Sequence, residues 1–195
     1  MNYLAHAYLS GNDPELMVGN FIADAVKGKK INAYDNGIRN GMILHRAIDE
    51  FTDSHAIVKK SCRRLSTKYR HYSGVIVDIF YDHFLASKWH MHHDSSIEEY
   101  TKYVYDTVVA HNEILPEKIQ HMLKYMIPQN WLLNYRSFEG IDQVLKGMSR
   151  RTTFESGMEH AIDDLKSGYS EFEGEFDAFF PDVCNFAKNY ISELT

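Results

Sequence analysis

The sequence predicts an all-α fold, a single compact multi-helix domain over residues 1–195. Apolar residues recur at helical spacing along most of the chain, no segment shows a convincing period-two alternation, and only 4 prolines occur in 195 residues. The 44% hydrophobic content, with 13 Tyr and 11 Phe, is enough for one sizeable and largely aromatic core. No internal repeat or long linker divides the chain.

Helix signals mark the first half of the chain. Asp13 followed by Pro14 is typical of an N-cap and a first helical position, which predicts a helix that runs to about Gly28. The other helices expected in this half cover about 34–64, with a break near Ser54, and about 75–89.

Similar signals continue to the end of the chain. Ser96 and Glu99 form a capping box, so a helix follows them. Pro116 opens another helix that reaches about Ile127. The remaining helices are expected at about 138–150, 154–172 and 177–194.

Composition excludes several classes of protein. The only cysteines are Cys62 and Cys184, which argues against a disulfide scaffold and against a cysteine zinc site. No apolar stretch approaches the roughly 20 residues that a membrane helix requires, and the N-terminal residues do not resemble a signal peptide. We therefore expect a soluble cytoplasmic protein with no membrane partner. The sequence does not indicate the oligomeric state of the protein.

Charge is segregated along the chain, although the formal net charge is −6. The stretch 59–70 contains six basic residues and no acid, whereas 155–182 contains nine acids against Lys166 alone. Helical spacing places Lys59, Lys60, Arg63 and Arg64 on one cationic face. This face is either a solvated surface or a docking surface for an acidic partner. Nucleic acid is not favoured, because the rest of the chain would repel it.

Asp78 and Asp82 are the most informative acids, because the stretch 75–85 is apolar almost everywhere else. Residues four apart share a helix face, so the two carboxylates lie one above the other. A helix that is apolar nearly all round is normally buried, and two unpaired buried anions are costly. We expect a metal ion or arginines to neutralise them.

Three further segments supply residues of the same chemical types. His45 and Asp49 lie four apart, on a helical stripe with Ile38, Met42 and Ile48 that indicates an inward face. Asn20 and Asp24 repeat this spacing in a small, apolar segment. The complete set of expected metal ligands or close neighbours is His6, Asp24, His45, Asp49, Asp78, Asp82 and His83.

Imidazole and carboxylate groups from several helices suit a divalent cation, and mixed ligation does not select among Mn²⁺, Fe²⁺, Zn²⁺ and Mg²⁺. Such an ion activates water and polarises a phosphoryl oxygen, which are the requirements of phosphoester hydrolysis. Arg46 is the favoured phosphate contact, and Arg136, Arg150 and Arg151 are weaker candidates. The alternative is that each pair is an ordinary hydrogen bond, with the acids paired to arginines.

Several of these motifs resemble the acyl-carrier-protein phosphodiesterase family. The motifs, which span roughly residues 1–151 in the same order, are Asn2-Tyr3-Leu4-Ala5-His6, Gly19-Asn20-Phe21-Ile22-Ala23-Asp24, His45-Arg46-x-Ile48-Asp49-x-x-Thr52-Asp53, Asp78-x-x-Tyr81-Asp82-His83-Phe84-Leu85, Trp131-Leu132-x-x-Tyr135-Arg136 and Gly147-Met148-Ser149-Arg150-Arg151.

The resemblance implies a hydrolase that removes the 4′-phosphopantetheine arm from a serine of holo-acyl carrier protein. It also implies a helical array like that of HD-type metal-dependent phosphohydrolases, with manganese as the usual activator. Catalytic roles are expected for Asp24, His45, Arg46, Asp49 and Asp82. Acyl carrier proteins are acidic, so Lys59, Lys60, Arg63 and Arg64 are expected to dock the carrier.

Two other functions remain open at this stage. One is hydrolysis of another small phosphoester, such as a nucleotide, at the same helical site. The other is a non-catalytic helical interaction module in which the acids merely pair with arginines.

Overall fold

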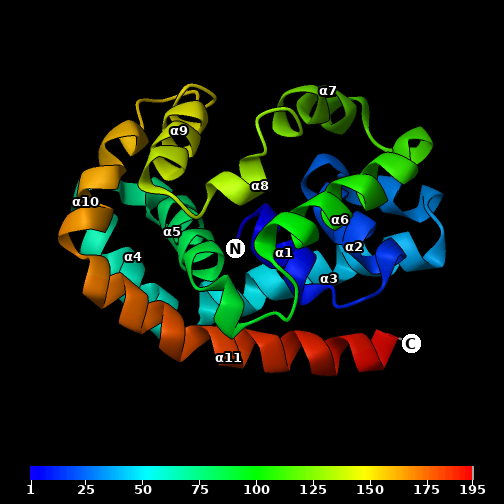
Figure 1. The fold of residues 1–195 in the computed structure, drawn as a ribbon, viewed down its shortest axis with the longest axis horizontal. Helices are drawn as coiled ribbons and strands as arrows, with labels where there is room; N and C mark the ends of the chain where they lie inside the picture. Colours follow the sequence, from blue (N-terminus) through cyan, green and yellow to red (C-terminus); the bar gives the residue numbers. More distant parts are fainter. Residues whose placement is uncertain (195) are drawn as a thin grey trace.

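The computed structural model describes residues 1–194 (Figure 1). Helix α5, Ser73–Ser87, lies in the interior of the protein. It is apolar almost all round, and eleven of its residues are buried. Such a helix needs neighbours on every side. The helices that pack against it are α1 (Tyr3–Leu9), α4 (Ala56–Tyr69), α9 (Phe138–Ser149) and α11 (Tyr169–Leu194).

Helices α2 (Pro14–Ile22) and α3 (Asn36–Ser54) approach each other closely because glycines meet at their crossing. A Cβ atom on Gly19 would lie 2.0 Å from the carbonyl oxygen of Ile38, and one on Gly41 would lie 2.2 Å from that of Leu16. Only glycine allows this contact. The close approach brings the middle of α2 against the middle of α3.

The remaining helices complete the structure on both sides of α5 (Figure 1). They are α6 (Ile97–Ala110), α7 (Glu117–Met126), α8 (Trp131–Asn134) and α10 (Ala161–Ser167). The capping box at Ser96 and Glu99 is confirmed, as is the helix break after Ser54, where His55 separates α3 from α4. Pro116 is the N-cap residue of α7.

Two expectations for the C-terminal third were wrong. No helix begins at Phe154, because Gly157 adopts a left-handed conformation (φ +67°) that ends any helix there, and a short 3-10 turn follows it. The segments 154–172 and 177–194 are not the last two helices either, since α11 continues through Gly174 and Pro181. Its buried phenylalanines hold it against the core along this length (Phe172, Phe176, Phe179 and Phe180).

The all-α class is confirmed, since residues 1–194 contain helices and no strand, and their buried side chains form one core. In the same part of the chain, none of the helices combines the length and the apolar character that crossing a bilayer would demand. Helix α1, a seven-residue helix that carries His6, was not predicted from the sequence. The resemblance to an HD-type array stays a prediction.

Candidate active site

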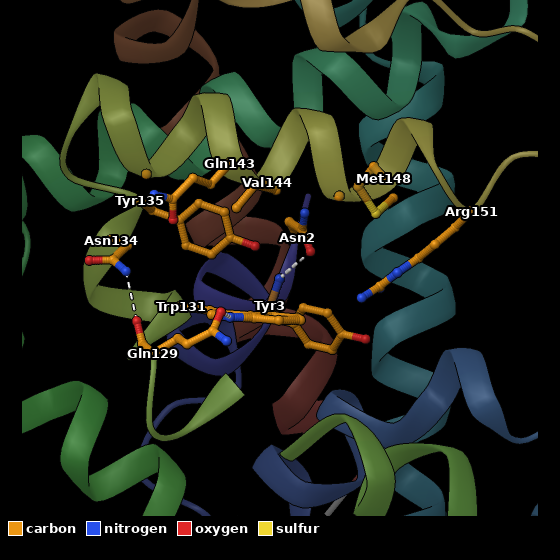
Figure 2. Close-up of a pocket in the computed structure, with 12 residues that line it drawn as sticks. Asn2, Tyr3, Gln129, Trp131, Asn134, Tyr135, Gln143, Val144, Met148 and Arg151 are labelled. Carbon is orange, nitrogen blue, oxygen red and sulfur yellow. Dashed lines mark hydrogen bonds between the residues drawn. The ribbon is translucent and has the colours of Figure 1, made fainter. Parts of the chain in front are cut away.

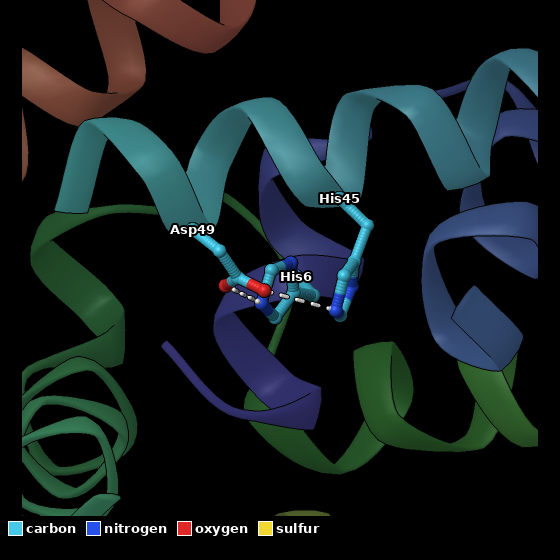
Figure 3. A group of neighbouring side chains, drawn as sticks. All are labelled: His6, His45 and Asp49. Atoms are coloured by element: carbon cyan, nitrogen blue, oxygen red, sulfur yellow. Dashed lines mark hydrogen bonds and ion pairs between the residues drawn. The ribbon is translucent and has the colours of Figure 1, made fainter. Parts of the chain in front are cut away.

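His6, His45 and Asp49 converge from two helices that are far apart in the sequence (Figure 3). His6 comes from α1, and His45 and Asp49 lie one turn apart on the facing side of α3. The Nε2 atom of His6 lies 3.1 Å from Oδ1 of Asp49, and Nε2 of His45 lies 3.2 Å from Oδ2 of Asp49. The two imidazole rings stack with centroids 4.0 Å apart. This His-His-Asp group has donor atoms close enough to share one cation.

Asn20 fixes the orientation of the His45 ring. Its Nδ2 donates to the carbonyl oxygen of His6 and to Oγ of Ser10, both at 2.9 Å, so its Oδ1 is left to accept. Nδ1 of His45 donates to that oxygen at 3.0 Å. In the neutral ring the lone pair is therefore on Nε2, the nitrogen that faces the carboxylates. The glycine contact between α2 and α3 makes this arrangement possible.

The two histidines have opposite electrostatic environments. Burial and the neighbouring positive charge of His45 lower the pKa of His6 to about 4. Burial also opposes protonation of His45, but hydrogen bonds and charge from Asp24 and Asp49 outweigh it and raise its pKa to about 9. The cluster therefore concentrates one positive charge at Nε2 of His45, between acidic groups.

Two carboxylates face that nitrogen. Oδ1 of Asp24 lies 3.4 Å from Nε2 of His45, although the Asp24 side chain is 79% exposed at the mouth of the site. The hydrogen bond from His45 lowers the pKa of Asp24. Burial would raise the pKa of Asp49, yet its contacts with both histidines hold it well below the usual range. Both acids stay ionised at neutral pH.

The donor set fits a divalent cation. Nδ1 of His6 is buried and makes no hydrogen bond within the described residues, and the buried Nε2 of His45 faces the carboxylates of Asp24 and Asp49. Nε2 of His45 with its lone pair would repel the oxygens of Asp24 and Asp49, so this position requires either a proton or a metal ion. Two imidazoles and two carboxylates match the preferences of Mn²⁺, Fe²⁺ and Zn²⁺.

Asp78 and Asp82 are met by different partners. Asp82 is fully buried at the beginning of α1, where it accepts backbone N–H groups of Asn2, Leu4 and Ala5 at 3.0, 3.0 and 3.4 Å. Asp78 forms an ion pair of 2.7 Å with the amino group of Met1. The N-terminal segment thus supplies partners for both acids of the apolar helix, an amino group for Asp78 and backbone donors for Asp82, and neither acid belongs to the His-His-Asp group.

Three other candidates lie away from this group. Nδ1 of His83 donates to the carbonyl oxygen of Tyr135 at 2.8 Å, and its ring stacks on Phe138. Arg46 donates to the carbonyl oxygen of Val26 at 3.3 Å. Arg136 is exposed and paired with Glu98. These contacts give each residue a local structural partner.

The basic face of α4 meets the acidic C-terminal third of the chain. Lys60 and Arg64 pair with Glu175 of α11 at 3.3 and 3.0 Å. Lys59 and Arg63 are exposed, and no ion pair within residues 1–194 involves them. The two oppositely charged segments of the sequence therefore partly neutralise each other, and two cations of the expected docking face stay directed to solvent.

The cluster opens into a cavity of about 390 Å³. Sequence reasoning did not assign several of its lining residues to the site, because they come from the N-terminal segment, from the end of α3, and from the beginning of α5 and the turn before it. Those residues are Met1, Asn2, Tyr3, Asp53, His71 and Gly74. The repeated spacing of Asn20 and Asp24 was the one sequence signal that placed a further residue, Asn20, at the site.

Comparison with known proteins identifies relatives over nearly the whole chain. Residues 1–183 match the family described as acyl carrier protein phosphodiesterase. Proteins with that name from Photorhabdus laumondii and Yersinia enterocolitica are 31% and 29% identical to this chain over 190 residues. The aligned part covers 97% of this chain and 96% and 98% of those two proteins. No solved structure matches the chain.

Proposed function

We propose that this chain, which belongs to the acyl carrier protein phosphodiesterase family, hydrolyses the phosphodiester between 4′-phosphopantetheine and the serine of holo-acyl carrier protein. The products are the apo-carrier and the free phosphorylated arm. The observation that supports a hydrolytic site most strongly is the placement of His45 Nε2 between Asp24 and Asp49. A cytoplasmic location is part of the same proposal.

The residues of the cluster have distinct proposed roles. His6, His45, Asp49 and Asp24 would hold a divalent cation, which lowers the pKa of water and polarises a phosphoryl oxygen when bound. Asn20 keeps Nε2 of His45 directed at the site by accepting from Nδ1. Asp24 lies at the mouth, where an exposed carboxylate can orient a water and accept its proton.

Manganese is the proposed metal, with Fe²⁺, Zn²⁺ and Mg²⁺ as the alternatives to be compared. Two imidazoles and two carboxylates favour a borderline cation over Mg²⁺, which prefers oxygen ligands and retains water. Asp78 and Asp82 are left out of this proposed ligand set because they already accept from the N-terminal segment. Arg46, Arg136 and His83 are left out because their contacts lie elsewhere.

The primary experiment measures loss of the prosthetic arm. Holo-acyl carrier protein is incubated with the protein and Mn²⁺, and mass spectrometry follows conversion of the holo form to the apo form. The His45→Ala variant is the matched control, because it removes the central nitrogen of the cluster. Retention of the arm by the wild-type protein with each of the four metals would refute the proposed function.

An acidic carrier would dock on the exposed part of the basic face. Asp53, just before α4, and His71, just after it, both line the cavity of the cluster. Lys59 and Arg63 are exposed on α4, the helix between these two lining residues, and they carry the charge expected to guide an acidic protein.

Charge reversal separates docking from folding. Lys59→Glu with Arg63→Glu is expected to raise the KM for holo-carrier by about tenfold at low salt, with a smaller effect at high salt. Lys118→Glu with Lys124→Glu on α7 is the control for net charge. Equal KM values and equal salt dependence in the two double variants would remove α4 from the docking surface.

A further inference from the structure

A second cavity of about 190 Å³ opens beside the cluster (Figure 2). It lies between the N-terminal residues, the short helix α8 and one face of α9. None of the residues discussed so far as ligands lines it. Its walls are largely apolar, with Val144 and Met148 on one side and Trp131 and Tyr3 facing them.

This cavity adjoins the cavity of the cluster at two residues. Asn2 and Tyr3 line both spaces. The Tyr3 hydroxyl donates to Sδ of Met122 at 3.4 Å, which holds the ring in place. Burial and the charge of Asp24 raise the pKa of Tyr3 to about 12, while the charge of Arg151 opposes this rise. Tyr3 thus lies between the acidic cluster on one side and Arg151 on the other.

The lining combines flat apolar surfaces with amide groups and one cation. Nε1 of Trp131 donates to Oε1 of Gln129 at 2.9 Å, and Nδ2 of Asn134 donates to the carbonyl oxygen of Gln129 at 2.7 Å. Gln143 adds a third amide side chain at the rim. The guanidinium of Arg151 lies 5.7 Å from the centre of the Trp131 ring, and Figure 2 shows its side chain directed towards Tyr3.

We propose that this second cavity binds the pantetheine arm of the carrier while the phosphodiester lies at the His6, His45 and Asp49 cluster. The inference rests on the proposed function. The arm leaves the phosphate opposite the carrier serine, so it enters a space that adjoins the phosphate site, and this cavity shares Asn2 and Tyr3 with the cavity of the cluster. Its dimethyl carbon, two amide bonds and thiol chain match a lining of apolar side chains interspersed with amides.

Gly147 offers a direct way to fill the cavity. It lies on α9, lines the cavity, and a Cβ atom built on it meets no heavy atom within 4 Å. Leucine at this position therefore occupies the space without a backbone clash, and it favours the helix more than glycine does. Gly174 on α11 is an exposed helical glycine with equally free space, so Gly174→Leu is the matched control.

Steady-state kinetics give the first test. Gly147→Leu is expected to raise the KM for holo-carrier by about tenfold or more relative to Gly174→Leu. The same two variants are assayed on bis(4-nitrophenyl) phosphate, a small diester without the arm. The ratio of their KM values should be at least about tenfold smaller on this substrate than on holo-carrier. The arm site would be overturned if Gly147→Leu raised the KM equally for both substrates, or if the two variants had equal KM values for holo-carrier. A wild-type protein inactive on holo-carrier would instead refute the proposed function.

Binding gives a second test that does not depend on activity. Titration of the metal-free protein with pantetheine should change the fluorescence of Trp131, and Trp131→Phe should abolish this change. Trp89, the other tryptophan, is buried against Tyr8 and His93 and should contribute none. Gly147→Leu should weaken binding by about tenfold and Gly174→Leu should not. Absence of a response in the wild-type protein, or equal affinity in both glycine variants, would overturn the inference.

Discussion

Helix α1 meets two carboxylates in different ways. At its beginning, Asp82 of α5 accepts backbone N–H groups of Asn2, Leu4 and Ala5. In its middle, His6 contacts Asp49 of α3. Backbone N–H groups can only donate hydrogen bonds to Asp82, because their nitrogen has no lone pair available to bind a cation. Imidazoles can lose a proton and bind a cation instead. A buried acid therefore indicates a metal site only where side chains with available lone pairs face it.

Removal of a carboxylate from the cluster should have the largest effect. Asp49→Asn is expected to lower kcat/KM for holo-carrier on the order of 10³-fold, because it deprives both histidines of their shared acidic partner. Circular dichroism should show the same helicity as in the wild-type protein. Asp106→Asn, an exposed acid on α6, is the control. Activity within about threefold of wild type would exclude Asp49 from the reaction.

Asp82 should behave in the opposite way. Asp82→Asn replaces a carboxylate oxygen by an NH₂ group that faces backbone N–H groups, so we expect the free energy of unfolding to fall by about 3 kcal/mol. Urea denaturation measures this change. The protein that remains folded should keep most of its specific activity. A variant of wild-type stability and greatly reduced activity would return Asp82 to the catalytic group.

Metal binding should distinguish the two carboxylate sites thermodynamically. Mn²⁺ at about 100 times its dissociation constant should stabilise the wild-type protein by about 2.7 kcal/mol, which thermal denaturation detects as a rise in Tm. Asp82→Asn should keep this rise, while His45→Ala should lose it. A chelator should reverse the rise where it occurs. If His45→Ala responds to Mn²⁺ as the wild-type protein does, the cation binds elsewhere.

Local sequence signals predicted the helices better than they predicted the partners of the acids. Periodicity and capping residues identify α3, α5 and α6, because these signals lie within each helix. The break expected between 172 and 177 did not occur, since packing of the α11 phenylalanines outweighs the low helix propensity of Gly174.

In the site too, local arrangement was predicted from the sequence and long-range partners were not. The stripe on α3 correctly placed His45 and Asp49 together on one face of the helix, where His45 is buried and Asp49 is 42% exposed. The burial of Asp82 was also expected, but its partners were not, because they are main-chain groups 77 to 80 residues away in the sequence, at the beginning of α1. The amino-acid types in the sequence do not indicate which backbone N–H groups will donate to a distant acid.

Glu175 extends the comparison to a buried acid held by side chains alone. Burial would raise its pKa, but hydrogen bonds from Ser61, Arg64 and Lys60 lower it below the usual 4.5. Tyr81 donates to Ser61, which donates to Glu175 at 2.5 Å. These donors contain no imidazole, so the group should contribute stability without affecting metal binding.

Glu175→Gln should have the smallest effect of the four variants, and its sign depends on pH. The unfolded chain binds a proton more tightly than the folded one, so ionised Glu175 stabilises the fold above pH 4.5 and this contribution disappears as the pH falls through the lower pKa of the folded state. At pH 7 we expect the free energy of unfolding of the variant to be about 1 kcal/mol lower than that of the wild-type protein. Urea denaturation at a series of pH values should show wild type and variant converging on the acid side. A difference that is constant with pH would mean that packing, and not charge, is what Glu175 contributes.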